Sequence, residues 1–163
     1  MAISVLAVHE RIGSWGRQLR SRLSDRSVRI VETRSAEDLE RAIRGAVSPL
    51  VVIDLGQRIR SGLADLQRAL SVAPDALTLV IDPNSQKDVM TFARELGATQ
   101  VLSGPVTPIQ VLDVMTRWLS LAQERVKLSE LSLSESEPSG TDPLGWLESH
   151  IQRVSAGQRA TGD

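Results

Sequence analysis

Strand and helix patterns alternate along most of the chain, and this alternation constrains its fold more than any other feature. Short runs of apolar, often β-branched residues predict five strands, at about residues 3–8, 27–31, 50–54, 77–81 and 99–102. Each run is followed by apolar residues at helical spacing. Five strand–helix units of this kind predict a doubly wound α/β fold, with a parallel sheet and right-handed crossovers.

The third predicted strand ends in a carboxylate. Residues 50–53 are apolar and mostly β-branched, which is typical of a parallel strand buried on both faces, and Asp54 follows them directly. In an open parallel sheet, ligands and catalytic groups gather beyond the carboxyl ends of the strands. Asp54 is therefore a candidate reactive group. The alternative is an aspartate that only caps the following loop through backbone N–H groups.

The order of these features resembles the receiver domain of two-component response regulators. The segment VLAVHE places His9 and Glu10 where that family has an acidic pair, and VVIDL places Asp54 at the phosphoacceptor position. Gly62 stands at the loop glycine that opens the third helix. The stretch ELGATQVLSGPVTP is similar to the end of the family's pattern, with Pro105 at the proline of its Lys-Pro pair.

The resemblance covers about residues 3–122 and has consequences for both fold and chemistry. It implies a flavodoxin-like sheet of five parallel strands in the order 2-1-3-4-5, flanked by five helices. It also implies a bacterial signalling protein of the phosphorelay type, in which a histidine kinase phosphorylates Asp54. Glu10 and Asp54 would then be weak ligands of Mg²⁺, with Glu10 binding through water.

Three departures from the family's pattern indicate a degenerate pocket. Asp82 occupies the position of a Ser or Thr, Gly104 the position of the lysine, and Arg58 the position of a proline. Phosphoryl transfer depends on positive charge that compensates the transferring group, and Gly104 offers none. An ionised Asp82 accepts hydrogen bonds and repels a phosphoryl anion. Asp54 is thus a loop cap, a vestigial family position or a true phosphoacceptor.

Composition excludes several other functions. The 163 residues carry a formal net charge of −1, contain no cysteine and include only four Phe or Trp residues. These values exclude disulfides and thiolate metal sites, and they disfavour nucleic acid and membranes as partners. No export signal or membrane span is indicated, which favours a cytoplasmic protein. Phosphate-binding glycine loops are missing, so a flavin- or nucleotide-binding enzyme domain is a weaker alternative.

The last predicted helix has two apolar stripes where one would suffice for docking on a sheet. One consists of Leu112, Met115, Leu119, Ala122 and Val126, and the other of Val111, Val114, Trp118 and Leu121. The first is predicted to face the sheet, and the second is predicted to bind a partner, either another protein or a second copy of this chain. The alternative is a single wide stripe that faces the core.

The sequence after this helix divides into two further segments. Residues 128–141 are rich in Ser and Glu, which predicts a flexible acidic linker between the domain at residues 1–127 and the end of the chain. Residues 142–163 begin with a short amphipathic helix. Its docking residues would be Leu144, Trp146, Leu147 and Ile151. This helix would dock either on its own domain or on a partner.

Together, these patterns predict a signalling or scaffolding module that acts through protein contacts. The predicted module resembles a receiver domain with an incomplete phosphorylation pocket, and it is not an enzyme. No cofactor is expected other than Mg²⁺. The alternative function is that of a receiver phosphorylated on Asp54.

Overall fold

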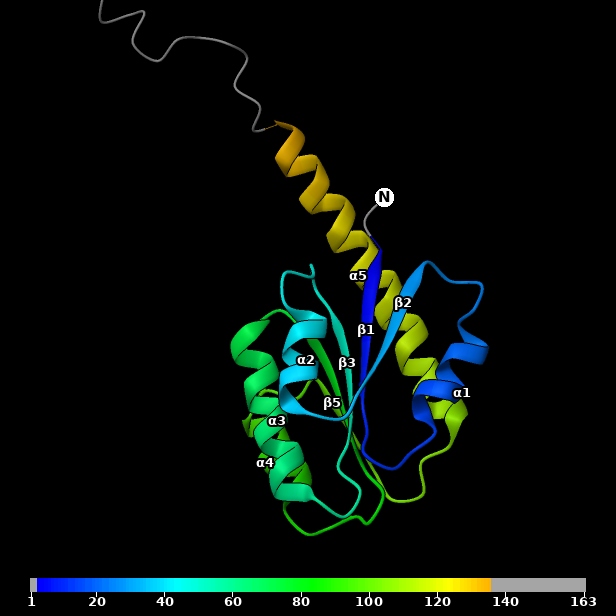
Figure 1. The fold of residues 1–163 in the computed structure, drawn as a ribbon, viewed down its shortest axis with the longest axis vertical. Coiled ribbons are helices and arrows are strands. Elements are labelled where there is room, and N and C mark those ends of the chain that lie inside the picture. The colour runs from blue at the N-terminus through cyan, green and yellow to red at the C-terminus, as the bar shows by residue number, and fades with distance from the viewer. Residues whose placement is uncertain (1–2, 136–163) are drawn as a thin grey trace, which may run out of the picture. The chain divides into compact units, whose positions relative to one another are not determined.

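The computed structural model describes residues 3–135, and it confirms the predicted fold. The chain divides into two compact units, Met1–Ser129 and Glu130–Asp163. The first unit holds a five-stranded parallel sheet in the order β2-β1-β3-β4-β5 (Figure 1). The strands are β1 (Ser4–His9), β2 (Val28–Thr33), β3 (Leu50–Asp54), β4 (Leu77–Asp82) and β5 (Gln100–Ser103). The helices are α1 (Trp15–Arg22), α2 (Ala36–Ile43), α3 (Ile59–Val72), α4 (Val89–Glu95) and α5 (Pro108–Glu135).

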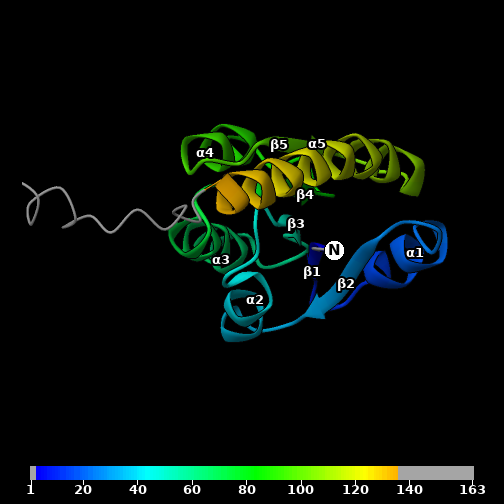
Figure 2. The same ribbon diagram turned by 90° about the horizontal axis from the view of Figure 1, so that it is seen from above.

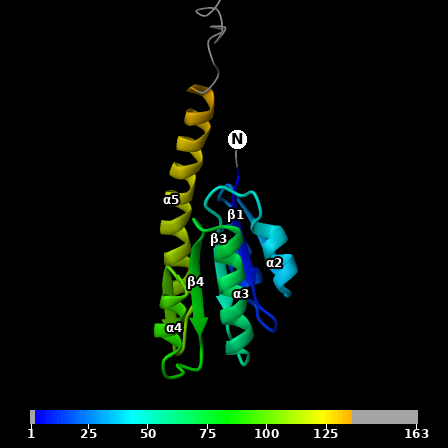
Figure 3. The same cartoon turned by 90° about the vertical axis from the view of Figure 1, so that its left-hand side faces the viewer.

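The central strands are apolar because helices cover both faces of the sheet. Along β3, alternate side chains enter two separate hydrophobic clusters, and residues 50–53 are fully buried. One cluster joins the sheet to α1 and α5, and the other joins it to α2, α3 and α4 (Figure 2). Figure 3 shows β4 between α5 and α3. This arrangement leaves the carboxyl edge of the sheet to the loops.

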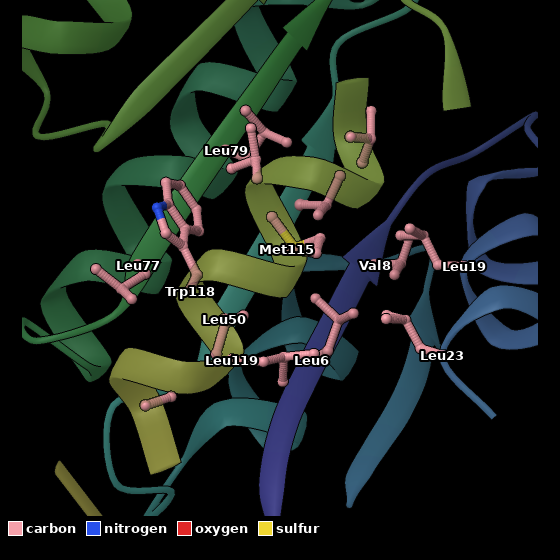
Figure 4. Packing of buried hydrophobic residues seen from close by; sticks show 14 of the residues in the cluster. Leu6, Val8, Leu19, Leu23, Leu50, Leu77, Leu79, Met115, Trp118 and Leu119 are labelled. Atoms are coloured by element: carbon pink, nitrogen blue, oxygen red, sulfur yellow. The ribbon is translucent and has the colours of Figure 1, made fainter. Parts of the chain in front are cut away.

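The prediction that the second stripe of α5 is a partner surface is wrong for three of its four residues. Val111, Val114 and Trp118 are buried, with Trp118 only 8% exposed, and they pack in the same cluster as Met115, Leu119 and Ala122 of the first stripe. Figure 4 shows Trp118, Met115 and Leu119 in this cluster. Both stripes face the sheet because the cluster beneath α5 is broad enough to accept a wide apolar face. Only Leu121 is exposed, at 46%.

The two ends of α5 differ from each other in how well the sequence predicts them. The start is confirmed, because Pro108 is its first residue and the hydroxyl of Thr107 accepts a hydrogen bond from the N–H of Gln110 at 3.4 Å. The helix continues to Glu135, so residues 128–135 are helical where a linker is predicted to start.

No helix between residues 3 and 135 is both long and apolar enough to cross a membrane.

The predictions for the end of the chain fall outside the described residues. They concern the rest of the linker and the docking residues Leu144, Trp146, Leu147 and Ile151. They remain predictions.

Candidate functional site

The carboxyl edge of the sheet brings together the acidic residues that the sequence singles out. Asp54 ends β3 and lies opposite Ile81 of β4, and Asp82 ends β4 opposite Ser103 of β5. Glu10 directly follows β1, and Gly104 directly follows β5. The predicted pocket residues therefore share one edge, as parallel strands require.

Asp54 is half-buried and its carboxylate is held from two sides. Its Oδ1 accepts a hydrogen bond from the N–H of Gly56 at 3.0 Å, and its Oδ2 accepts one from the indole Nε1 of Trp15 at 3.1 Å. Burial raises the pKa of Asp54, these two hydrogen bonds partly oppose the rise, and the nearby charge of Glu10 adds to it. The bond to Gly56 is the loop cap that the sequence left open as an alternative.

Trp15 is the site residue that sequence reasoning missed. Its helical spacing marks it only as an apolar residue of α1, and it is in fact the first residue of that helix. A largely buried tryptophan nevertheless needs an acceptor for its indole N–H, and a carboxylate is a strong one. That requirement is the signal that could have linked Trp15 to a strand-end carboxylate.

Glu10 is buried and caps the start of α1. Its Oε2 accepts the N–H of Trp15 at 2.9 Å, and its Oε1 accepts the N–H of Gly16 at 3.0 Å. A carboxylate in this place satisfies free N–H groups of the first turn and complements the helix dipole. A Cβ atom on Gly13 would overlap the carboxylate of Glu10, so a larger residue there would displace this carboxylate. Glu10 therefore orients the helix that presents Trp15 to Asp54.

Asp82 is fully buried and organises the loop between β4 and α4. Its Oδ1 accepts the N–H of Asn84 at 3.2 Å, and its Oδ2 accepts the N–H of Gln86 at 2.8 Å. Two backbone donors compensate the burial of this carboxylate. A threonine, with a single hydroxyl oxygen, could not hold the loop in the same way.

Gly104 has a backbone role as well as lacking a charged side chain. Its φ of +85° lies in the left-handed region, and its N–H donates to the carbonyl oxygen of Asp82 at 2.9 Å. A Cβ atom at this position would lie 3.1 Å from the Oγ of Ser85. The backbone conformation of this loop therefore favours glycine at the position where the family has lysine.

His9 occupies an acidic position of the family and is used for packing between elements. Its Nε2 lies 3.0 Å from Oδ2 of Asp65 on α3, and its Nδ1 lies 3.0 Å from the hydroxyl of Thr33 on β2. His9, Thr33 and Asp65 are all buried. A neutral imidazole that donates from Nε2 and accepts at Nδ1 satisfies all three side chains. His9 therefore joins β1, β2 and α3 and offers no free ligand atom.

The carboxylates that would bind a divalent cation are engaged within the fold. Magnesium demands a near-octahedral set of oxygen ligands, whereas both oxygens of Glu10 and both oxygens of Asp54 accept hydrogen bonds from within the fold. Between residues 3 and 135, no group of three or more Asp, Glu, His or Cys side chains is placed to hold a metal ion.

A pocket of about 350 Å³ opens beside Asp54, between the loops that follow β1 and β3. Buried His9 and Asp65 line it together with the exposed residues Arg11 and Arg58. Its other lining residues are Ile12, Leu55, Gly56, Gln57, Ser61, Gly62 and Pro83. β1 and β3 are neighbours in the sheet although β2 lies between them in sequence, so the pocket sits at the topological switch point.

Solved structures are similar to this chain in fold. No family profile and no curated protein matches its sequence. A CheY-like receiver domain protein from Methanospirillum hungatei matches with a TM-score of 0.63 at 14% identity, covering 76% of this chain and 98% of that one. A response regulator protein from Burkholderia pseudomallei, solved with a phosphorylated aspartic acid, calcium and citrate, matches with a TM-score of 0.58 at 20% identity, covering 96% and 86%.

The beryllofluoride-activated receiver domain dimer of NtrC4 also matches, with a TM-score of 0.60 at 18% identity, covering 72% of this chain and 98% of that one. At these identities, the matches establish the fold. The chain has the receiver-domain fold of response regulators in two-component signalling.

Proposed function

We propose that this chain is a signalling or scaffolding module that acts through protein contacts and does not use Asp54 as a phosphoacceptor. The observation that supports this most directly is the use of the pocket carboxylates. Glu10, Asp54 and Asp82 each accept two hydrogen bonds from N–H groups of the fold. The acidic residues therefore serve to hold the loops and α1 in place.

The chemistry of phosphoryl transfer gives the second reason. The transferring group spreads negative charge over its oxygens, and catalysis consists mainly of offsetting that charge. Asp54 would have to give up the indole of Trp15, and the neighbouring Asp82 and Glu10 add further negative charge. Gly104 supplies no cation, and its left-handed φ disfavours any longer side chain.

Exposed apolar side chains on either side of the edge strand β5 are the proposed contact surface. Met90 and Phe92 of α4 are 39% and 55% exposed, and Ile109 and Leu121 of α5 are 66% and 46% exposed. Large apolar side chains in exposed positions are candidates for anchors of a protein interface. The partner is another protein or a second copy of this chain, and the matching NtrC4 receiver domain is a dimer.

A phosphoryl-analogue titration tests the proposal. The full chain, labelled with ¹⁵N, is mixed with Mg²⁺ and beryllium fluoride, and separately with Mg²⁺ and acetyl phosphate. We expect no aspartyl adduct by mass spectrometry and no Mg²⁺-dependent shift in the amide signal of Asp54. A stoichiometric adduct that disappears in Asp54→Asn would overturn the proposal.

Two further variants ask whether the pocket lacks only its charge-compensating groups. Gly104→Lys with Asp82→Thr restores the family's residue types, and Gly104→Asn with Asp82→Thr is the matched control, because it disturbs the same backbone without adding a cation. We expect neither pair to form the adduct, since Asp82 also holds its loop. Adduct formation in the lysine pair alone would show that charge compensation is the only deficit.

The alternative function, a receiver phosphorylated on Asp54, has one observation in its favour. Asp54 is only half-buried and borders the pocket of about 350 Å³, so a phosphoryl donor could approach it. The titration described above distinguishes this alternative directly.

A further inference from the structure

Two arginine side chains line the pocket beside Asp54 together with two carboxylates. Its two carboxylates are engaged: Asp65 accepts from His9, and Asp54 accepts from Trp15 and Gly56. In the part of the chain that the structure describes, the guanidinium groups of Arg11 and Arg58 make neither an ion pair nor a hydrogen bond.

The two arginines reach the pocket from different loops. Arg11 belongs to the loop after β1, and Arg58 immediately precedes α3, so both loops place a cation at one pocket. Arginine presents a planar fork of donors that matches a carboxylate or phosphate group with two parallel hydrogen bonds. Ser61, in the first turn of α3, also lines the pocket, but its hydroxyl already donates to the carbonyl oxygen of Arg58 at 3.1 Å.

The start of α3 supports the same preference for negative charge. Its N-cap residue is Arg58, which makes no side-chain capping bond, and its first turn has no acidic residue. The positive end of a 14-residue helix therefore lacks the carboxylate that such ends often attract. By contrast, Glu10 fills that role for α1.

We propose that this pocket binds a small organic anion, whose carboxylate or phosphate group is held between Arg11 and Arg58. The volume of about 350 Å³ is at the lower end for small-molecule sites and exceeds the needs of a bare inorganic ion. Ile12, Leu55 and Pro83 provide apolar lining for the body of such a molecule. The binding is non-covalent and requires neither Mg²⁺ nor modification of Asp54.

The charges that face the pocket make the proposal specific. Arg11 and Arg58 attract an anion, whereas the carboxylates of Asp54 and of Asp65, which accepts a hydrogen bond from the neutral imidazole of His9, repel it. Loss of either arginine should weaken binding, and loss of the Asp54 charge should strengthen it. Arg60 lies in the first turn of α3, next to Ser61, but does not line the pocket. It is therefore a matched control for the loss of one positive charge.

The test is a titration of the ¹⁵N-labelled full chain with inorganic phosphate and, separately, with succinate, at constant ionic strength and without Mg²⁺. We expect saturable shifts of the amide signals of Gly56, Ser61 and Gly62 with at least one probe, and the stronger probe identifies the preferred head group. Arg11→Ala and Arg58→Ala should each weaken binding about tenfold, as expected for loss of a charge-assisted bidentate contact. Arg60→Ala should stay within about twofold of the unmodified chain, because Arg60 is exposed and screened, and Asp54→Asn should bind more tightly.

Two outcomes would overturn the proposal. One is the absence of saturable shifts with either probe. The other is an equal loss of binding in Arg60→Ala and Arg58→Ala, which would indicate general attraction by surface charge. Neither outcome bears on the phosphorylation of Asp54, because the titration contains no phosphoryl donor.

Discussion

The two faces of the sheet are filled by different kinds of side chain. The cluster that α1 and α5 form with the sheet contains Trp118 and Met115, and Trp15 packs against it. The cluster under α2, α3 and α4 contains no aromatic residue among its members, which include the six alanines Ala7, Ala69, Ala73, Ala76, Ala93 and Ala98. Small side chains let three helices lie close to the sheet, whereas the two helices on the other face, α1 and α5, leave room for large ones.

The difference between the two faces determines which substitutions should be costly on each of them. On the α1 and α5 face, stability depends on filling volume, so removal of a large side chain should be most costly. On the α2, α3 and α4 face, stability depends on the close approach of the helices to the sheet, so a larger side chain should be costly. At the carboxyl edge the two faces meet at Asp54, which Trp15 of α1 contacts from one side.

The largest expected effect is that of Trp118→Ala. Removing a buried tryptophan leaves a cavity and loses apolar contacts, and we expect the free energy of unfolding to fall by about 3–5 kcal/mol. Urea unfolding followed by circular dichroism measures it. A stability equal to that of the unmodified chain would mean that Trp118 does not fill the α5 face and would restore it as a candidate interface residue.

An intermediate effect is expected for Gly62→Ala on the opposite face. A Cβ atom there would lie 2.5 Å from Cδ2 of Leu55, so the leucine would have to move, at a cost of about 1–3 kcal/mol. Leu55→Ala removes the obstacle. In a double-mutant cycle, the cost of Gly62→Ala should therefore shrink in the Leu55→Ala background. Strict additivity would show that close packing at Gly62 is not the cause.

A smaller effect is the pH dependence that Asp54 contributes. Its pKa is raised in the folded protein, so the folded state holds the proton more tightly than the unfolded chain does. The resulting stabilisation is fully present below the ordinary value of 3.8 and is lost as the pH rises through the raised pKa. The stability of the unmodified chain relative to Asp54→Asn should therefore fall over that interval.

Trp15→Phe provides the matched control for this pH dependence. The indole hydrogen bond lowers the pKa of Asp54, so its removal should shift the loss of stability to higher pH. Urea unfolding at a series of pH values measures both variants. If the stability of the unmodified chain, relative to that of Asp54→Asn, rises with pH, the pKa of Asp54 is not raised in the folded protein.

The sequence predicts the fold well because the fold depends on periodicity, which a single chain displays. Five alternating units determine the order of strands and helices, and Asp54, Asp82 and Gly104 fall at strand ends where the resemblance places them. The use of these residues was harder to predict. The bond from Trp15 to Asp54 joins residues 39 positions apart, and no local pattern reports it.

Helix faces were the least predictable part, as α4 and α5 show. Val89 and Phe92 are three residues apart in α4, yet Val89 is buried and Phe92 is 55% exposed, because the seven-residue helix buries only Val89 and Ala93. The same kind of spacing assigns Trp118 to a partner, yet it is buried. Apolar periodicity identifies a helix, but the neighbouring elements decide how wide a face it can bury.

The smallest expected effect on stability is therefore that of Phe92→Ala. An exposed side chain loses few contacts on truncation, and we expect the free energy of unfolding to change by no more than about 0.5 kcal/mol, in contrast to Trp118→Ala.

If Phe92 anchors a contact between two copies of the chain, the same variant should raise the dissociation constant at least about thirtyfold, as loss of a central aromatic anchor does. Sedimentation velocity over a range of concentrations measures this. Arg94→Ala, on the same helix, is the control for a surface change that removes no apolar anchor. A large loss of stability in Phe92→Ala would show that its ring belongs to the core. Unchanged association in a chain that does dimerise would remove Phe92 from the proposed contact surface and leave Met90 of α4 and Ile109 and Leu121 of α5 as the remaining candidates.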